Sequence, residues 1–244
     1  MRYEIFGDNL QMVNVEMDGN DKLFGEAGVM VYMSNDIKME PVARGGLLKG
    51  MGRKVFMGET FFLTEFTGKG NVSFAGNVPG KIIAIEMGDG KDILAQRDAF
   101  LCASDGVDLS VAFQKKLSSA FFGGEGWIIE KISGEGMCFL HACGDIKEME
   151  LKAGETIRVD TGSVVAWEGS VNYSVNRVKG VKTILFSGEG LFLTTLTGPG
   201  KVWIQSMTLH NLASALSPYS SGSSSTSGAG GVLSTLARES FGRR

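Results

Sequence analysis

The fold can be inferred from one thirteen-residue pattern, which first occurs as Gly58-Glu-Thr-Phe-Phe-Leu-Thr-Glu-Phe-Thr-Gly-Lys-Gly70. It aligns without a gap on Gly124-Glu-Gly-Trp-Ile-Ile-Glu-Lys-Ile-Ser-Gly-Glu-Gly136 and on Gly188-Glu-Gly-Leu-Phe-Leu-Thr-Thr-Leu-Thr-Gly-Pro-Gly200. Self-similarity at a nearly constant period indicates a chain built from related units. We therefore expect one domain over residues 1–212, made of three repeats at about 1–78, 79–144 and 145–212.

Each copy of the pattern indicates β-structure. Its first run, such as residues 60–67, is rich in aromatic, β-branched and leucine residues and is too short for a stable helix. The Gly-x-Gly that follows supplies the positive φ of a tight connection, so each copy is predicted to be a β-hairpin. Three such units can pair their edges around a pseudo-threefold axis and close a common core. The predicted fold class is all-β, of the double-stranded β-helix type.

Residues of the second run are expected to alternate between two faces. One face is predicted to be core and holds two sets of equivalent positions: Val72, Cys138 and Val202, and Phe74, Leu140 and Ile204. The other face carries Ser73, Phe139 and Trp203 and is predicted to meet solvent or a second subunit. Because Phe139 and Trp203 are large and apolar, the sequence favours a homo-oligomer, with coverage by the chain's own loops as the alternative.

Composition narrows the class of protein. The chain has 244 residues and balances 24 Lys and Arg against 27 Asp and Glu, which excludes a basic protein that coats nucleic acid. Three cysteines are an odd number in a chain of this size and fit a reducing compartment. No secretory signal or long apolar run is present, so we expect a cytoplasmic protein without a transmembrane segment.

Helices are expected to be few and short, near residues 111–119 and 208–216. Residues 213–244 differ from the rest of the chain, because a Ser- and Gly-rich run cannot bury enough apolar surface to fold. They are predicted to form a flexible linker and a short basic amphipathic tail. That tail could dock as a helix, or fray as chain ends commonly do.

The sequence contains no convincing catalytic or metal site. The nearest candidate is Cys138-x-x-His141-x-Cys143, but Cys138 and His141 would point to opposite faces of a strand and Cys138 takes a core position. The only other histidine is His210, and phosphate-binding, nucleophile-elbow and zinc-protease motifs do not occur. We therefore expect no cofactor, no bound metal and no enzymatic activity.

Two sets of charged residues recur with the repeats. Residues 49–54, 114–119 and 177–182 carry 8 of the 24 basic residues and no acid, and could form a basic ring that binds anions. The acids Glu59, Glu125 and Glu189 occupy equivalent positions and could hold a cation, or could simply bond to local backbone N–H groups. Solvated loops are the alternative for the basic ring, whose residues are Lys49, Arg53, Lys54, Lys115, Lys116, Arg177, Lys179 and Lys182.

The run of residues 45–70 and its echo at 187–200 resemble the altered inheritance of mitochondria protein 24 family. The resemblance covers about residues 1–210 and implies three β repeats similar to subunits of the trp RNA-binding attenuation protein, often in homo-oligomers. For a mitochondrial relative it also implies a role in inner-membrane organisation without known catalysis. We expect no presequence in this chain, so mitochondrial placement is not expected to carry over.

The expected function is that of a non-enzymatic β scaffold, which self-assembles and organises a partner at an anionic membrane surface. The alternative is a regulatory protein that binds a small ligand or nucleic acid. Few aromatic residues are interleaved with the basic residues, which weakens the nucleic-acid interpretation. A hydrolase would need a deep pocket of polar side chains that the sequence does not reveal.

Overall fold

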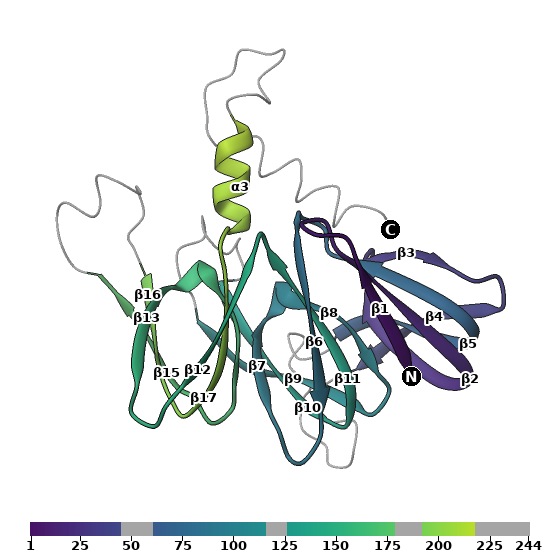
Figure 1. Ribbon diagram of the computed structural model, residues 1–244, viewed down its shortest axis with the longest axis horizontal. Helices are drawn as coiled ribbons and strands as arrows, with labels where there is room; N and C mark the ends of the chain where they lie inside the picture. Colours follow the sequence, from purple (N-terminus) through teal and green to yellow (C-terminus); the bar gives the residue numbers. More distant parts are fainter. Residues whose placement is uncertain (45–60, 116–125, 179–191, 218–244) are drawn as a thin grey trace. The chain divides into compact units, whose positions relative to one another are not determined.

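A computed structural model describes residues 1–44, 61–115, 126–178 and 192–217 (Figure 1). The predicted all-β class is confirmed, because these residues hold seventeen strands and a single α-helix. Met1–Met207 form one compact unit and the chain from Thr208 onward is assigned to another. Within the described ranges, no helix is long and apolar enough to cross a membrane.

The strands fall into three consecutive segments of the chain, which we call segments 1, 2 and 3. Segment 1 contains β1 (Arg2–Phe6), β2 (Met12–Glu26), β3 (Met30–Met33), β4 (Ile37–Arg44) and β5 (Phe61–Ala75). Segment 2 contains β6 (Gly80–Met87), β7 (Ile93–Gln96), β8 (Phe100–Ser104), β9 (Val107–Lys115), β10 (Trp127–Gly134) and β11 (Gly136–Cys143). Segment 3 contains β12 (Ile146–Leu151), β13 (Thr156–Asp160), β14 (Val164–Glu168), β15 (Asn172–Arg177), β16 (Phe192–Thr197) and β17 (Gly200–Gln205).

The same four antiparallel pairings occur in every segment. In segment 2 the pairs are β6 with β11, β7 with β10, β8 with β11 and β9 with β10. Segment 3 has the matching pairs β12 with β17, β13 with β16, β14 with β17 and β15 with β16. In segment 1 the long strands β2 and β5 each take the place of two shorter ones, and β3 and β4 pair with β5. Positions in different segments can therefore be compared through their registers.

Two further ladders join the segments. The second half of β2 pairs with β8 through Leu23↔Ser104, and β7 pairs with β14 through Leu94↔Trp167. Among the described strands no ladder joins β13 to β3. The strands form three sheets rather than one closed sheet, and the pseudo-threefold axis stays a prediction.

The hairpin prediction for the Gly-x-Gly pattern is wrong. β5 runs unbroken through Gly68 and Gly70, while β10 and β11 on either side of Glu135 belong to different sheets and do not pair with each other. The glycines are needed because the chain crosses closely over a neighbour at this corner. At Gly70, whose φ is +143°, an added Cβ would lie 2.5 Å from the Ser34 Cβ. The Gly-x-Gly pattern, which predicted a tight turn, therefore marks the place where a strand stops pairing with one neighbouring strand and begins to pair with another.

The core consists of three clusters of buried side chains. The residues predicted to be core are buried or, for Ile204, half-buried against the third cluster. The prediction for the opposite face is wrong, because Ser73, Phe139 and Trp203 are all buried as well. Phe139 belongs to the cluster formed by residues of segments 1 and 2, and Trp203 belongs to the cluster that includes residues of β6 and β8. These two side chains therefore give no support to an oligomer.

One of the two predicted helices is present. α3 (Leu209–Leu216) begins after Thr208, whose hydroxyl accepts a hydrogen bond from the Asn211 backbone N–H at 3.0 Å. The helix expected near residues 111–119 is wrong, because β9 extends to Lys115. Ladder bonds with β10 outweigh the weak helical pattern of this stretch.

Candidate functional site

Most of the predicted charged sites lie outside the described residues. This holds for the equivalent acids Glu59, Glu125 and Glu189 and for Lys49, Arg53, Lys54, Lys116, Lys179 and Lys182. Two members of the basic set remain: Lys115 ends β9, where its backbone is described, and Arg177 ends β15 with an exposed side chain.

The strand ends that flank these basic stretches are alike in all three segments. Each stretch connects the fourth strand of its segment to the fifth, and these two strands are antiparallel neighbours. The last residue of one strand faces the first residue of the next, and each pair joins a cation to an aromatic residue. The pairs are Arg44↔Phe61, Lys115↔Trp127 and Arg177↔Phe192.

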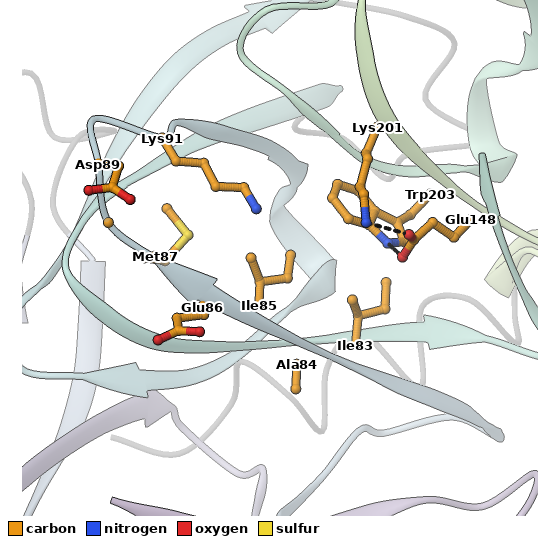
Figure 2. Close-up of a pocket in the computed structure, with 11 residues that line it drawn as sticks. Ile83, Ala84, Ile85, Glu86, Met87, Asp89, Lys91, Glu148, Lys201 and Trp203 are labelled. Atoms are coloured by element: carbon orange, nitrogen blue, oxygen red, sulfur yellow. Dashed lines mark hydrogen bonds and ion pairs between the residues drawn. The ribbon is translucent and has the colours of Figure 1, made fainter. Parts of the chain in front are cut away.

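An open groove of about 500 Å³ lies beside β6 (Figure 2). One wall is the continuous run from Ile83 to Asp89, and Glu148, Lys201 and Trp203 form the facing wall. Figure 2 shows Ile83 and Ile85 on the side of β6 that faces Trp203, with Glu86 on the other side. The groove therefore runs along a strand, with an apolar floor and a charged rim.

The polar side chains of the facing wall are bonded to one another. Glu148 accepts hydrogen bonds from the Lys201 Nζ and from the Trp203 Nε1, both at 2.8 Å. These bonds lower the pKa of the Glu148 carboxyl, the lysine bond having the larger effect. Lys91, at the end of the groove, lies 3.5 Å from Glu168. A ligand in the groove would therefore contact charged side chains that are already paired with one another.

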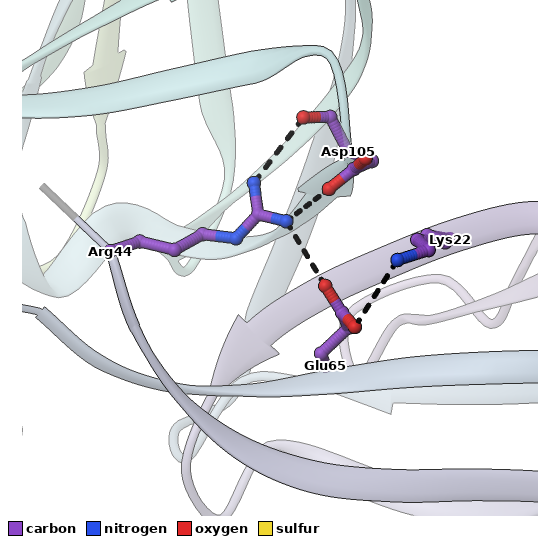
Figure 3. Close-up of polar contacts among 4 residues, drawn as sticks. All are labelled: Lys22, Arg44, Glu65 and Asp105. Carbon is purple, nitrogen blue, oxygen red and sulfur yellow. Dashed lines mark hydrogen bonds and ion pairs between the residues drawn. The ribbon is translucent and has the colours of Figure 1, made fainter. Parts of the chain in front are cut away.

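Arg44 ties segment 1 to segment 2 (Figure 3). Its guanidinium forms ion pairs with Glu65 and with Asp105, the latter lying in the turn between β8 and β9. It also lies over the Phe24 ring, 4.0 Å from the ring centre. Lys22 approaches the other oxygen of Glu65 at 3.7 Å. A planar, permanently charged side chain suits this position because it contacts two carboxylates and a ring at once.

Two carboxyl groups with raised pKa values lie near Arg97 and Asp98: Glu26 is half-buried and Glu130 is buried. Burial raises the pKa of Glu130 to about 8, and the charge of Glu26 raises it further. Burial likewise raises the pKa of Glu26 to about 7. The Glu130 side chain is 1% exposed, and its Oε2 has no hydrogen-bond partner among the described residues. A carboxyl in this setting prefers its neutral form.

The cysteines and His141 are packing residues. Cys102, Cys138 and Cys143 are buried with free thiols, and burial raises the pKa of each. His141 is buried against Gly76 and Gly80, and burial lowers its pKa. Within the described ranges, no three His, Cys, Asp or Glu side chains are grouped to hold a metal ion.

The sequence profile of the family described as Mitochondrial biogenesis AIM24 matches residues 3–207. The chain belongs to this family. An uncharacterised protein of Streptococcus pyogenes serotype M6 is 30% identical over 217 residues, which make up 85% of this chain and 86% of that protein.

The crystal structure of a Streptococcus pyogenes protein resembles the structure of this AIM24-family chain, with a TM-score of 0.69. The match covers 89% of this chain and 99% of the other at 24% sequence identity, so the likeness concerns the fold alone. Both the family resemblance and the all-β fold expected from the sequence are therefore confirmed.

Sequence reasoning missed Glu130, although the copies of the pattern contained the signal. In this AIM24-family chain, the positions equivalent to Glu130 hold Thr64 and Thr194. Thr194 is buried and donates a hydrogen bond to the Thr161 hydroxyl at 3.0 Å. Thr161 occupies the position equivalent to Arg97. Segment 2 therefore has the charged residues Arg97 and Glu130 where segment 3 has the hydroxyl groups of two threonines. A difference between copies at a core position marks a residue that needs a separate explanation.

Proposed function

We propose that the protein is a non-enzymatic β scaffold that assembles head to tail with copies of itself and presents its basic connections to anionic lipid headgroups. The observation that carries the proposal is a pair of complementary open edges. Within the chain, the second strand of one segment pairs with the third strand of the next, as β2 does with β8 and β7 with β14. Segment 3 has a second strand, β13, and segment 1 has a third strand, β3, that lack this pairing among the described strands.

Side-chain exposure supports the same conclusion. Val31 and Tyr32 on β3 are 55% and 48% exposed. The residues at the matching positions of β8, Leu101 and Cys102, are fully buried. β3 therefore exposes apolar residues of the kind that internal junctions cover, and a second copy of the chain would cover them in the same way.

The internal ladders also specify the register of the contact. Leu23 pairs with Ser104 at the first junction, and the matching positions are Ile157 on β13 and Ser34, directly after β3. β13 of one copy is then antiparallel to β3 of the next, with Val159 opposite Tyr32. Because the two edges differ, the contact is heterologous and forms a ring if the rotation closes.

A substitution on β3, one of the two open strands, tests the proposed assembly. Val31→Lys is expected to weaken self-association at least about tenfold, because the contact would bury an unpaired charge. Met39→Lys, on β4 and 51% exposed, is the matched control and should associate like the wild type. Light scattering after size-exclusion chromatography, over a range of protein concentrations, measures both. A wild type that stays monomeric, or equal losses in both variants, would contradict head-to-tail assembly.

Vesicle binding tests the proposed anionic partner. Changing Lys49, Arg53 and Lys54 to Gln should weaken sedimentation with anionic vesicles, because each basic residue near such a surface contributes about 1 kcal/mol. A triple Gln variant at Lys38, Lys147 and Lys152, which are exposed lysines elsewhere, changes the charge equally and should bind like the wild type.

Equal binding by both triple variants would remove the role of the basic connections. Wild-type binding should also fall as salt is raised and should be absent with neutral vesicles. Absorbance at 260 nm that persists in the purified protein at high salt would instead favour the nucleic-acid alternative.

A further inference from the structure

β1 shows how an additional strand binds to this fold. It pairs antiparallel with the first half of β2, from Arg2↔Glu16 to Phe6↔Met12. The opposite edge of β2 pairs with β5, so this half of β2 has a neighbour on both sides. β1 precedes the four recurring pairings and has no equivalent in segments 2 and 3 among the described strands.

β6 takes the place of that half of β2 in segment 2, and its corresponding edge is open from Ile83 onward, beyond the bonds of Gln11 to the Gly80 C=O and the Ile82 N–H. Its described strand partner is β11 alone. The registers with β5 and β11 make Val15-Glu-Met17 equivalent to Ile85-Glu-Met87. Ile85, Glu86 and Met87 line the groove of Figure 2. The groove thus lies where a counterpart of β1 would bind.

The backbone of β6 presents hydrogen-bonding groups along this edge. The Ile82 N–H donates to the Gln11 Oε1 at 2.8 Å, so it points away from β11. Because strand groups alternate with a period of two, the N–H and C=O groups of Ala84 and Glu86 point the same way. An extended segment beside β6 would pair with them.

The side-chain contacts of β1 predict which residues such a segment needs. Arg2 forms an ion pair with Glu16 at 2.7 Å, and the Tyr3 ring packs edge-on against Phe139 at 5.0 Å. Ile5 packs against the same core cluster as Phe139. Tyr3, which is 43% exposed, and Ile5 therefore contact the core, and they alternate with Arg2 and Glu4.

The groove offers a matching partner for each of these side chains. Glu86 is exposed and holds the place of Glu16, while Trp203 holds the place of Phe139. The apolar floor of Ile83 and Ile85 replaces Val13 and Val15.

We propose that this groove binds an extended segment of a partner protein, which adds to β6 as an antiparallel strand. The segment carries a basic residue opposite Glu86, an aromatic residue opposite Ile85, any residue opposite Ala84 and an aliphatic residue opposite Ile83. Ladder bonds supply affinity and alternate side chains supply specificity, as in other cases of strand addition. This site is separate from the edges used in the proposed assembly.

A labelled peptide with the β1 sequence, Arg-Tyr-Glu-Ile-Phe, tests the proposal by fluorescence anisotropy on the full chain. We expect saturable binding, weakened at least about fivefold by Glu86→Arg because the ion pair becomes a repulsion. A peptide with Glu in place of its Arg should bind Glu86→Arg better than it binds the wild type. Glu40→Arg, at another exposed position, on β4, should leave binding unchanged.

Three results would overturn the proposal. The first is no binding by the wild type at millimolar peptide, and the second is equal binding by both charge variants. The third is release of monomers from a wild-type assembly by the peptide, which would make β1 of a second copy the occupant. N-methylation of the central peptide N–H groups should abolish binding, because the ladder needs them. Vesicle binding and Val31-dependent assembly should be unaffected by Glu86→Arg, so this proposal and the proposed scaffold can fail separately.

Discussion

Glu130→Gln is expected to stabilise the protein at pH 8 by about 2–4 kcal/mol and to change its stability little at pH 5. The wild-type carboxyl is buried, and its pKa is raised to about 8 by desolvation and by the charges of Glu26 and Asp98. Arg97 opposes this shift. Cys138 is a further neighbour, and its own pKa is raised by burial and then by Glu130. A neutral amide removes the cost of ionising this group.

The sign follows from comparing the folded and unfolded states. The folded pKa of Glu130, about 8, lies above the ordinary value of 4.5 that applies to the unfolded chain. The stabilising effect of the neutral carboxyl is complete below pH 4.5 and is lost as pH rises towards 8. Glu26, with a folded pKa of about 7, contributes in the same direction over a narrower range. The wild type should therefore be more stable at pH 5 than at pH 8.

Urea unfolding at half-unit steps between pH 5 and pH 8.5 measures this effect. Glu26→Gln should flatten the pH profile in part, and Glu130→Gln should flatten it more. Glu40→Gln, at an exposed position, should leave the slope unchanged. A Glu130→Gln profile parallel to that of the wild type would show that Glu130 ionises normally in the folded protein.

Gly70→Ala is expected to destabilise the protein by about 2–4 kcal/mol, because it combines an unfavourable φ with a steric clash. The φ of Gly70 is +143°, and the new Cβ would lie 2.5 Å from the Ser34 Cβ. Ser34 cannot move freely, because its hydroxyl accepts a hydrogen bond from the Asn71 backbone N–H at 2.9 Å. Thermal and urea unfolding measure the loss.

Two other glycines separate the causes. Gly154 has a φ of +79°, and no described residue lies within 4 Å of an added Cβ, so Gly154→Ala should cost about 1–2 kcal/mol. Gly88 has open space among the described residues and no positive φ, so Gly88→Ala should be neutral or stabilising by up to about 1 kcal/mol. Equal losses at Gly70 and Gly154 would show that the close approach to Ser34 is relieved without cost.

The sequence predicted the fold class and most of the core. Its strand periodicity placed Val72, Cys138 and Val202 correctly, since apolar residues at alternate positions indicate burial. It failed for Phe139 and Trp203 because it assumed one buried face per strand. These strands have core on both faces, and only tertiary packing reveals that.

The connection at Gly-x-Gly was predicted wrongly for a related reason. Positive φ is needed both in a hairpin turn and in a strand that crosses over a neighbour, so Gly68 and Gly70 do not distinguish the two. The groove beside β6 could not be predicted either. It depends on the absence, among the described strands, of a partner on one side of Ile85, and a short motif does not indicate which neighbouring strands are missing.

In each segment the last strand pairs with a strand made much earlier, and this pairing has a consequence for synthesis of the chain. Met12 pairs with Ala75, and Ile82 pairs with His141, so a segment cannot close until its final strand has left the ribosome. Segment 1 can then close while β8, the partner of its outer edge, is still inside the ribosome. The nascent chain therefore carries a transiently unsatisfied edge at β2, which a chaperone or a neighbouring nascent chain could reach before Phe100–Ser104 emerge.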